Sequence, residues 1–226
     1  TADRLTSFMT ALRGDVTRGE DVARVLETIP ADMPPLAGVI HAAGVIDDGV
    51  VTELEWPRFE TVFAPKAAGA WLLHELTQSL PLDFFVLFSS TAWVIGSLGQ
   101  ANYASANAFL DALAHDRRAH GLPALSVNWG PWAESGMAAS LSARDRKRLN
   151  KQGFDHLTSE QGVTALARVL RSSAPQVSVF RADWKLVRAS FSPGTEPRLL
   201  TDMLRGAAPA SRRTSPAAPA LLAQLE

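Results

Sequence analysis

The stretch VLFSSTAWVIGSLGQANYASANAFLDALAHDRRAHGLPALSVNW, residues 86–129, decides the fold. It continues the apolar run 84–88, which is typical of a strand buried on both faces of a parallel sheet. A helix-length segment follows at residues 100–120 and stops at Gly121-Leu122-Pro123. Residues 125–129 then form a second buried apolar run. Strand, helix and strand in this order predict a parallel sheet covered by helices.

The same alternation extends over most of the chain. Short apolar runs predict further strands at residues 8–12, 36–40 and 177–180. Amphipathic spacing predicts helices over residues 20–29, from Pro57 onward, and over residues 159–171, where Ser159 is the expected N-cap. We therefore expect an α/β fold with a doubly wound parallel sheet, in which ligands bind at the carboxyl ends of the strands.

Composition and charge narrow the classes of function. The 226 residues are 46% hydrophobic and 20% charged, as in an ordinary globular domain. The 22 basic and 23 acidic residues leave a net charge of −1 and no basic excess for nucleic acid. The absence of cysteine excludes disulfides, zinc–thiolate sites and cysteine nucleophiles. Neither a membrane span nor a signal peptide is recognisable, so we expect a cytoplasmic protein without membrane or nucleic-acid partners.

The ends of the sequence suggest a piece of a larger chain. The first residues, TADRLTSFMT, include no initiator Met. From residue 206 to 219 the composition shifts to Ala, Pro, Ser and Arg, which is typical of a linker. We expect the folded part at residues 1–205 and the linker at residues 206–226.

Lys66 stands where an apolar residue is expected. The helix that Pro57 opens has an apolar stripe of Phe59, Val62, Phe63, Ala70 and Leu73. Lys66 falls on this stripe, four residues after Val62. One interpretation is a lysine that snorkels from the edge of the stripe to solvent. The other is a functional cation, because lysine is seldom buried without a partner or a purpose.

Tyr103 and Asn107 are also out of place, because they share one face of a helix that packs toward the sheet. Their plain interpretation is a core tyrosine with a satisfied hydroxyl and an asparagine bonded to nearby backbone. Ser89 and Ser90 directly follow the strand at 84–88. The sequence argues against Ser90 as a hydrolase nucleophile, since no Gly-x-Ser-x-Gly turn surrounds it.

The remaining ionisable residues give weaker signals. Asp47 and Asp48 follow the strand predicted at 36–40, and their plain interpretation is a solvated loop pair or helix N-terminal charges. The five histidines are His41, His74, His115, His120 and His156. They lack metal-ligand spacing, so we interpret them as surface or loop residues and predict no metal site.

Together these positions closely resemble the ketoreductase domain of modular type I polyketide synthases, a branch of the short-chain dehydrogenase/reductases. The resemblance runs from about residue 15 to residue 204 through the ordered motifs GDVT, HAAGVIDD, FAPKAAGAWLLHELT, FSS, YASAN, NWGPW and GMA. Tyr103 and Lys66 stand at the family's spacing from Ser90. Ordinary members of the superfamily carry Tyr-x-x-x-Lys, whereas Asn107 occupies that last place here and the lysine lies on the preceding helix. This exchange is typical of polyketide and animal fatty-acid synthase ketoreductases.

The resemblance implies a fold and a reaction. The fold is a Rossmann-type doubly wound sheet of the short-chain dehydrogenase/reductase kind. The reaction is the NADPH-dependent reduction of a β-ketoacyl thioester, carried on the phosphopantetheine of an acyl carrier protein, to a D-β-hydroxyacyl thioester. Tyr103 would donate a proton to the keto oxygen, and Lys66 would supply the cation that stabilises the phenolate. Ser90 would orient the carbonyl, and Asn107 would fix a relay water or the lysine amine. The remaining partners would be other domains of the same synthase, with the linker leading toward a carrier-protein domain.

The resemblance also implies cofactor contacts. Asp15 and Val16 would lie by the adenine, Ala42, Ala43 and Gly44 would line the ribose, and Lys66 and Tyr103 would reach the nicotinamide side. Residues 131–139 would form a lid. The family's TGGxGGxG loop, its first strand-helix-strand unit and the Arg that reads the 2′-phosphate have no counterpart in the sequence. The resemblance is therefore to an N-terminally incomplete domain, and we expect this polypeptide alone to bind NADPH poorly.

Three positions bear on stereochemistry by the same resemblance. Asp48 ends the triplet Ile46-Asp47-Asp48, where B-type members carry Leu-Asp-Asp. A-type members carry Trp eight residues before the tyrosine, and that position is Ile95 here. Leu98 stands where many epimerising B-type members have Pro. The resemblance implies a B-type domain that makes a D-configured hydroxyl without α-epimerisation.

Two other interpretations stay open. The chain could be a non-catalytic or inactive fragment of such a domain, although its complete Ser90, Tyr103, Lys66 and Asn107 set argues against decay of the parent. It could also be a stand-alone alcohol dehydrogenase of the same superfamily. The exchange of Lys66 and Asn107 and the Pro-rich tail disfavour this second alternative.

Overall fold

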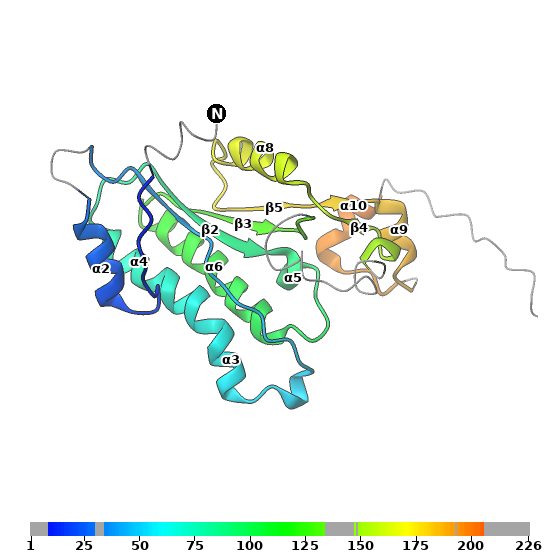
Figure 1. Cartoon of the computed structure of the whole chain (residues 1–226). Coiled ribbons are helices and arrows are strands. Elements are labelled where there is room, and N and C mark those ends of the chain that lie inside the picture. Colours follow the sequence, from blue (N-terminus) through cyan, green and yellow to red (C-terminus); the bar gives the residue numbers. More distant parts are fainter. Residues whose placement is uncertain (1–8, 30–33, 134–146, 148, 193, 206–226) are drawn as a thin grey trace, which may run out of the picture. The chain divides into compact units, whose positions relative to one another are not determined.

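A computed structural model describes residues 9–29, 34–133, 147, 149–192 and 194–205 of the chain (Figure 1). The chain divides into two compact units. The first consists of Thr1–Leu141 and His156–Arg181, and the second of Ser142–Asp155 and Ala182–Glu226. The predicted linker at residues 206–226 lies outside the described residues.

A four-stranded, fully parallel sheet forms the centre of the first unit, which confirms the predicted α/β fold. Its strands are β1 (Gly38–His41), β2 (Phe84–Ser90), β3 (Leu125–Trp129) and β5 (Gln176–Val179), in the spatial order β1-β2-β3-β5. Ser90 pairs with Trp129 at the carboxyl end of the ladder between β2 and β3. Because all four strands are parallel, their carboxyl ends lie at one edge of the sheet.

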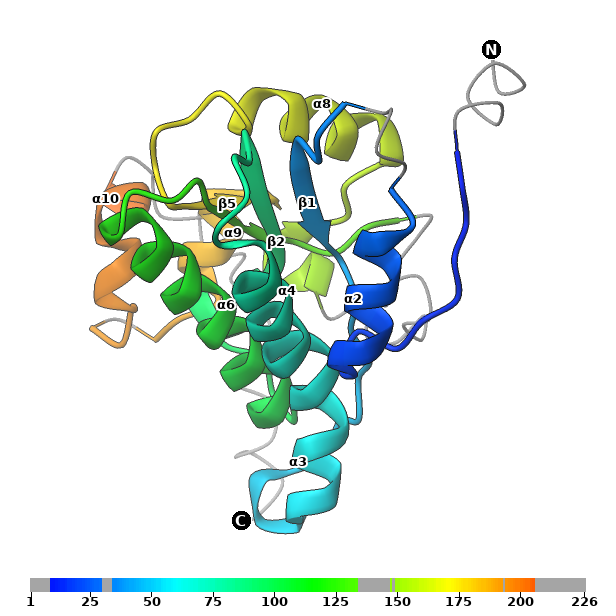
Figure 2. The ribbon, with the colours of Figure 1, turned by 90° about the vertical axis from the view of Figure 1, so that its left-hand side faces the viewer.

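Helices connect the strands of the first unit. They are α2 (Gly19–Glu27), the 3₁₀ turn η1 (Val51–Glu53), α3 (Trp56–Phe63), the π-helical turn η2 (Ala64–Ala68), α4 (Gly69–Thr77), α5 (Thr91–Val94), α6 (Ala101–Ala119) and α8 (Ser159–Val169). Figure 2 shows α4 and α6 on one side of the strands and α8 on the other. The predicted helices at 20–29, 100–120 and 159–171 are confirmed to within two residues at each end.

Alternate side chains of β2 fill the two faces of the sheet. Phe85 and Leu87 pack with Leu110 of α6 in one buried cluster. Val86 belongs to a second buried cluster, and Leu166 of α8 packs against this cluster on the opposite face of the sheet. A strand that is apolar on both faces is therefore explained by helices on both faces.

The long helix that the sequence predicts from Pro57 is interrupted by a wider turn. The α-helical segments α3 and α4 are joined by the π-helical turn η2. Pro65 lies in this turn and lacks the N–H that a regular helix would use at that position. π-helical turns of this kind recur at functional sites, and this one contains Lys66.

Two local expectations are wrong. No strand forms at residues 9–12, where Met9 is 73% exposed and Leu12 is 43% exposed, because no described strand pairs with this segment. The N-cap of α8 is Thr158 and not Ser159. Thr158 and Gln161 make a reciprocal capping box, which satisfies two helix N-terminal amides and so favours this boundary.

The second unit is small in its described part. It contains β4 (Phe154–Asp155), the second residue of β6 (Arg181–Ala182), the helices α9 (Trp184–Ala189) and α10 (Thr201–Arg205), and the 3₁₀ turn η4 (Arg198–Leu200). Asp183 caps α9 by accepting hydrogen bonds from the amides of Lys185 and Leu186.

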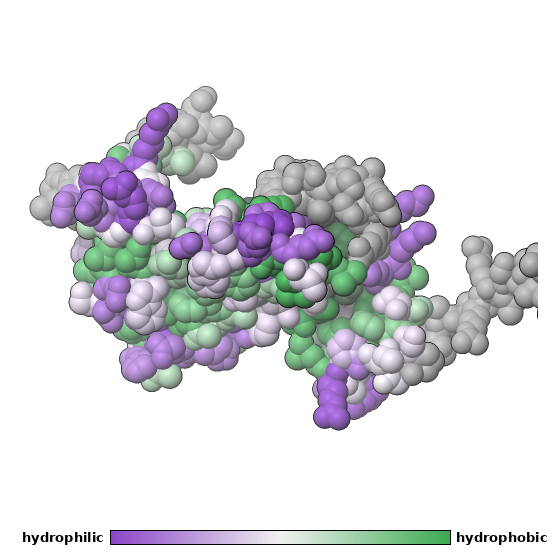
Figure 3. Space-filling model, turned by 90° about the horizontal axis from the view of Figure 1, so that it is seen from below, coloured by the Kyte–Doolittle hydropathy of each residue, from purple (hydrophilic) through white to green (hydrophobic). Residues whose placement is uncertain are grey.

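The surface mixes polar and apolar side chains. Figure 3 shows hydrophobic areas between hydrophilic ones on the face seen from below. Trp56 is 69% exposed and Val51 is 72% exposed, and such scattered residues are ordinary on protein surfaces. Among the described residues, no helix combines the length and the apolar character that crossing a bilayer requires.

Candidate active site at the carboxyl end of β2

Two serines end β2 at the carboxyl edge of the sheet. Ser89 is buried, and its hydroxyl donates a hydrogen bond to the backbone oxygen of Asn107 at 3.1 Å. Ser90 is the N-cap of α5, where its Oγ accepts a hydrogen bond from the amide of Ala92 at 3.1 Å. The cap fixes the direction in which the strand passes into the helix. The Ser90 hydroxyl is thus held at a defined place.

Tyr103 and Asn107 lie on one buried face of α6, as their spacing predicts. Tyr103 is 8% exposed and Asn107 is fully buried. Nδ2 of Asn107 donates to the backbone oxygen of Tyr103 at 2.7 Å, which satisfies one half of the amide within the helix. Its Oδ1 is buried and has no hydrogen-bond partner among the described residues. A buried acceptor without a partner is costly, so this oxygen is suited to receive a bound water or ligand.

Lys66 brings a cation to the same place. Its side chain is 2% exposed, so the interpretation that it snorkels to the surface is wrong. Nζ donates a hydrogen bond to the backbone oxygen of Phe88 at 2.8 Å and lies 5.3 Å from the centroid of the Tyr103 ring. Burial lowers the pKa of Lys66 from 10.5 to about 8, and the negative charge of Asp111 opposes this shift. At neutral pH the ammonium is therefore retained beside the phenol.

Two contacts around the π-helical turn set the path of the Lys66 side chain. Nε2 of His41 lies 3.1 Å from the backbone oxygen of Lys66. Burial lowers the pKa of His41, so the neutral ring donates its Nε2 proton to this carbonyl. Gly44 faces the same side chain, because a Cβ at this position would lie 2.9 Å from Cε of Lys66. Glycine therefore leaves the space that the lysine occupies.

The buried position of His41 corrects the expectation that the histidines are surface or loop residues. His74 is also buried, and its Nδ1 lies 2.8 Å from Nη1 of Arg117. His115 and His120 are exposed, as expected. Histidines that pack against the core cannot be told from surface ones by the spacing of metal ligands alone.

The environment of Tyr103 favours its protonated form. Burial raises the pKa of the phenol, and hydrogen bonding with the side chains of Ser90 and Asn107 opposes this shift. The charge of Asp48 raises the pKa further. At neutral pH the phenol is protonated and able to give a proton, while the nearby cation of Lys66 favours the phenolate that such a transfer leaves.

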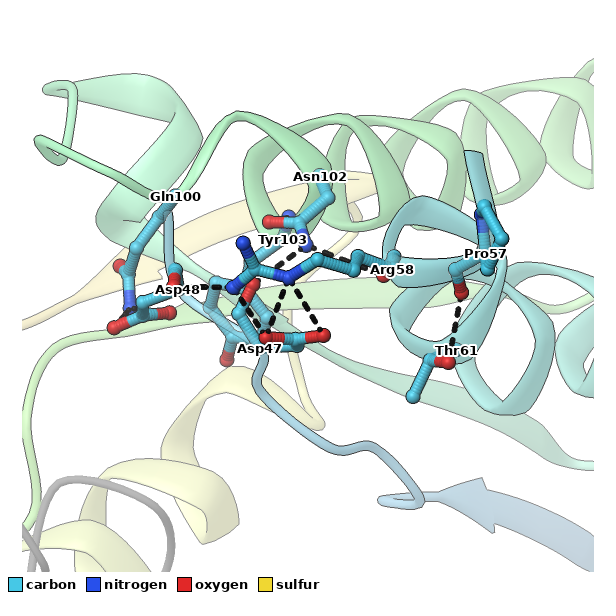
Figure 4. Close-up of polar contacts among 8 residues, drawn as sticks. All are labelled: Asp47, Asp48, Pro57, Arg58, Thr61, Gln100, Asn102 and Tyr103. Atoms are coloured by element: carbon cyan, nitrogen blue, oxygen red, sulfur yellow. Dashed lines mark hydrogen bonds and ion pairs between the residues drawn. The ribbon is translucent and has the colours of Figure 1, made fainter. Parts of the chain in front are cut away.

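The acidic segment after β1 is clamped against α3 and α6 (Figure 4). Arg58 binds the Asp47 carboxylate through Nε, at 3.0 and 3.1 Å, and through Nη2, and it also donates to the backbone oxygen of Asp48 at 2.7 Å. Hydrogen bonding with Arg58 lowers the pKa of Asp47. Gln100 donates to both oxygens of Asp48 at 3.1 Å, and Asn102 donates to the backbone oxygen of Asp47 at 2.9 Å. Asp47 is therefore a structural ion-pair partner, whereas Asp48 is the exposed acid of the two.

The remaining predicted site residues lie in three places. Ala42, Ala43 and Gly44 directly follow β1. Asp15 is exposed and accepts hydrogen bonds from the amide and hydroxyl of Thr17, which lower its pKa. Val16 lies against the first residue of α4, since a Cβ at Gly69 would be 2.8 Å from Cγ1 of Val16.

The two other predicted specificity residues lie between α5 and α6. Ile95 is partly buried and Leu98 is 80% exposed. Gly96 and Gly99 follow these two residues with φ of +85° and +77°, so they are turn glycines. Part of the predicted lid, residues 134–139, lies outside the described residues.

Sequence reasoning missed a polar hydrogen-bond network next to this site, in which Asp111, Ser126 and Asn128 are buried. Its members are Asp111 on α6, Ser126 and Asn128 on β3, and Gln176 and Ser178 on β5. A signal for it does exist. Asp111 is four residues after Asn107, which is itself four residues after Tyr103, and polar residues alternate along the otherwise apolar β3.

A family model and a curated relative match most of the chain's first unit. The KR domain family matches residues 3–134, more than half of the chain. Polyketide synthase GfsE of Streptomyces halstedii is 50% identical over 194 residues, which cover 85% of this chain and 5% of the synthase. The chain thus spans about one twentieth of the length of that relative.

Solved structures with the same fold include ketoreductases. The structure of an A1-type ketoreductase is 40% identical with a TM-score of 0.78, and the match covers 84% of this chain and 40% of that one. PlmKR1, the ketoreductase from the first module of phoslactomycin biosynthesis in Streptomyces sp. HK803, is 36% identical with a TM-score of 0.78. That match covers 88% of this chain and 45% of the other. The predicted fold of the short-chain dehydrogenase/reductase kind is confirmed by these likenesses.

Proposed function

The chain belongs to the KR domain family, and on that premise we propose that it reduces the β-keto group of an acyl thioester to a hydroxyl with NADPH as the reductant. The observation that carries the proposal is the grouping of a buried phenol, a buried cation and a partly buried hydroxyl at the carboxyl end of β2, formed by Tyr103, Lys66 and Ser90. These three groups suffice to bind a carbonyl oxygen and to protonate it.

Tyr103 is the proton donor in this proposal. Its phenol is protonated at neutral pH, since the ordinary pKa of tyrosine is already about 10 and burial raises it further. When the carbonyl carbon is reduced, its oxygen becomes basic and takes the phenol proton. Proton transfer by a positioned side chain typically contributes about 10²- to 10⁴-fold to a rate.

Lys66 stabilises the phenolate that this transfer leaves behind. Its Nζ lies 5.3 Å from the centroid of the Tyr103 ring, in a site from which water is largely excluded. Charges interact more strongly in such surroundings than in water. The hydrogen bond from Nζ to the backbone oxygen of Phe88 holds the cation in place before substrate binds.

Ser90 and Asn107 orient the reacting oxygen and return the proton. The Ser90 hydroxyl is fixed by its capping role and lowers the pKa of Tyr103, so it is suited to donate to the same carbonyl oxygen. Oδ1 of Asn107 is the buried acceptor without a described partner. We assign it to a water through which Tyr103 is reprotonated.

The residues around β1 fit a nicotinamide cofactor. A Cβ at Gly44 would collide with Lys66, so the Gly44 backbone packs directly against the lysine side chain. Because glycine has no side chain, a ligand can also approach this backbone closely. We propose that Ala42, Ala43 and Gly44 hold its ribose, that Lys66 contacts the same ribose, and that Asp15 and Val16 lie by the adenine. When bound, NADPH supplies the hydride that the carbonyl carbon accepts.

We assign D-configuration to the new hydroxyl, without epimerisation at the α carbon. Asp48 is presented from a segment that Arg58 and Gln100 hold in place, so an acid at this position has a defined direction. Ile95 and Leu98 occupy the two positions at which other types of ketoreductase differ. The likeness to an A1-type ketoreductase concerns the fold, whereas these side chains bear on the direction from which a substrate enters.

The proposed substrate is carried by an acyl carrier protein on phosphopantetheine, and the proposed partners are the other domains of a polyketide synthase. Support for this comes from the identity to GfsE, a polyketide synthase. Residues 206–226 have the composition of a linker toward such a carrier domain.

The proposal is tested by NADPH oxidation with a β-ketoacyl N-acetylcysteamine thioester, measured in the full-length natural polypeptide. We expect turnover by the wild type, and a loss in kcat of about 10²- to 10⁴-fold for Tyr103→Phe with little change in KM. Chiral chromatography of the product should show the D-hydroxyacyl thioester. Equal rates for the two proteins would refute the role of Tyr103, and an L product would refute the stereochemical assignment.

A further inference from the structure

The carboxylate of Asp111 is buried and accepts hydrogen bonds from three side chains in the described part of the protein. Asp111 is 3% exposed. Its Oδ2 accepts from Nε1 of Trp93 at 2.8 Å and from Nδ2 of Asn128 at 2.7 Å, and its Oδ1 accepts from Oγ of Ser126. An indole and an amide nitrogen can only donate, so this set of partners fits an ionised carboxylate.

These hydrogen bonds form part of a closed ring. Nδ2 of Asn128 donates both to Asp111 and, at 2.9 Å, to Oγ of Ser89. Oγ of Ser89 in turn donates to the backbone oxygen of Asn107, which is one helical turn before Asp111 on α6. The ring therefore ties the carboxyl ends of β2 and β3 to the turn of α6 that follows Tyr103.

A separate arm of the network reaches the Ser90 segment. Trp93 lies on α5, the short helix that Ser90 caps, and its indole donates to Asp111. The hydroxyl of Thr91, also on α5, donates to the backbone oxygen of Trp129 at 3.2 Å. Two anchors thus follow Ser90 directly in the chain, Thr91 to β3 and Trp93 to Asp111 on α6. Loss of the Asp111 anchor would let α5 shift relative to α6.

Side chains of β5 fix the other end of the Asn128 amide. Oδ1 of Asn128 accepts hydrogen bonds from Nε2 of Gln176 at 2.9 Å and from Oγ of Ser178 at 3.3 Å. The Asn128 amide is therefore satisfied on both ends, and its orientation cannot reverse without losing bonds on both sides. Fully satisfied polar networks of this kind rigidify the elements that they join.

Asp111 also carries the charge opposite to that of Lys66. Among the described residues, Tyr103 on α6 and His41 at the end of β1 are the ionisable groups next to Lys66, and Asp111 acts on it electrostatically. The phenol and the neutral imidazole carry no charge at neutral pH, so Asp111 is the anion that acts on this buried cation. No ion pair joins Asp111 directly to any described cation. Its negative charge is therefore not neutralised by an adjacent cation and can stabilise the ammonium of Lys66 from a distance.

We propose that Asp111 is a positioning residue of the reductase site, which holds the Ser90 segment against the helix of Tyr103 and supports the buried ammonium of Lys66 through its negative charge. The proposal rests on the function proposed above, because it concerns the same three groups. It adds a residue that touches neither substrate nor cofactor.

The test compares Asp111→Asn, Trp93→Phe and the control Asp116→Asn in the full-length natural polypeptide, with kcat and KM measured from pH 6 to 10. Asp116 is an exposed acid on the same helix, so its variant controls for a change of charge on α6. We expect kcat of Asp111→Asn to fall about tenfold at pH 7 with KM nearly unchanged, and its decline at alkaline pH to begin about one pH unit lower. Asp116→Asn should behave like the wild type.

Trp93→Phe separates geometry from charge, because it removes one anchor and leaves the carboxylate ionised. We expect its kcat to fall about two- to fivefold with the alkaline decline unmoved. The pH dependence of the melting temperature gives a readout without substrate, and the rise in melting temperature with pH that Lys66 causes should begin at lower pH in Asp111→Asn. If Asp111→Asn fails to fold, the kcat of Trp93→Phe decides whether the hydrogen bond between α5 and Asp111 positions the site.

The outcomes separate this proposal from the function on which it rests. An inactive wild type would refute the reductase function. An active wild type with unchanged kcat and unchanged pH dependence in Asp111→Asn would refute the role of Asp111 alone. Wild-type kcat in a folded Trp93→Phe would refute the anchoring of α5, and a loss in which kcat and melting temperature fall together without any shift in pH dependence would show Asp111 to be a structural residue only.

Discussion

Nζ of Lys66 lies 5.3 Å from the centroid of the Tyr103 ring, and both side chains are buried. The cation is held there at an energetic cost. Its pKa falls from 10.5 to about 8 because burial disfavours the charged form. At ~1.4 kcal/mol per pKa unit, the buried charge lowers the free energy of unfolding at neutral pH by ~3 kcal/mol. A protein that keeps such a charge gives up stability for function.

Lys66→Met should therefore make the protein more stable and inactive. Methionine fills a similar volume without a charge, and the gain is reduced by the lost hydrogen bond to Phe88. We expect the free energy of unfolding at pH 7 to rise by about 2 kcal/mol, and turnover to fall at least about 100-fold. Denaturant unfolding and NADPH oxidation measure the two effects. Lys185→Met, at an exposed lysine, is the control and should change neither quantity. A destabilised Lys66→Met protein would contradict this account of the buried charge.

The same shift predicts how stability depends on pH. Between pH 8 and 10 the unfolded chain keeps the Lys66 proton while the folded protein loses it, so the unfolded state binds more protons and the free energy of unfolding rises with pH. The slope approaches ~1.4 kcal/mol per pH unit. Tyr103 acts in the opposite direction above pH 10, because its pKa is raised in the folded protein. Unfolding measured at pH 8, 9 and 10 should show the rise in the wild type, and its absence in Lys66→Met. A rise of equal size in both proteins would assign it to other groups.

Periodicity in the sequence reveals which face of a helix or strand is buried, and this was enough for much of the site. The spacing of Tyr103 and Asn107 placed them on one face of α6, and the apolar run before Ser90 placed that serine at a strand end. Those predictions depend only on the repeats of helix and strand, which the chain follows closely here. The strand expected at 8–12 had hydrophobicity but no neighbouring strand to pair with, and pairing is not visible in a local pattern.

Other parts of the site depend on contacts that no local pattern encodes. The π-helical turn at residues 64–68 adds one residue to a single turn, and Pro65 was its only local sign. The donation from His41 to the Lys66 backbone joins residues from two different elements. Asp111 was overlooked because the buried face of α6 was judged by its apolar residues, while the partners of the carboxylate lie on β3 and α5.

Gly44→Ala tests the packing around Lys66. The added methyl group would lie 2.9 Å from Cε of Lys66, so the lysine side chain must move away from the phenol. We expect kcat to fall about tenfold or more, with folding preserved because the clash involves the far part of a flexible side chain. Gly19→Ala is the matched control, since its Cβ would meet only Leu72, at 3.7 Å. Turnover and circular dichroism distinguish the two variants. Normal turnover in a folded Gly44→Ala protein would show that the position of Lys66 is not critical.

Arg58→Met tests whether the clamp on the acidic segment controls stereochemistry. Arg58 holds Asp47 through its guanidinium and also donates to the backbone oxygen of Asp48. Methionine keeps part of the side-chain volume but removes every one of these bonds. Asp48 should then lose its fixed direction, and we expect the ratio of D to L product to fall about tenfold while reduction continues.

Chiral analysis of the hydroxyacyl product gives this ratio directly, and Glu60→Gln is the control because Glu60 is exposed on the same helix. Since lysine cannot form the planar two-point contact of Arg58 with a carboxylate, Arg58→Lys should lower the ratio as well, although it preserves the charge. Loss of selectivity in both Arg58 variants would attribute the effect to geometry. An unchanged ratio in an active Arg58→Met protein would mean that the substrate is oriented by other residues. A lowered ratio in Arg58→Met alone would mean that the positive charge, and not the two-point contact, holds Asp48 in place.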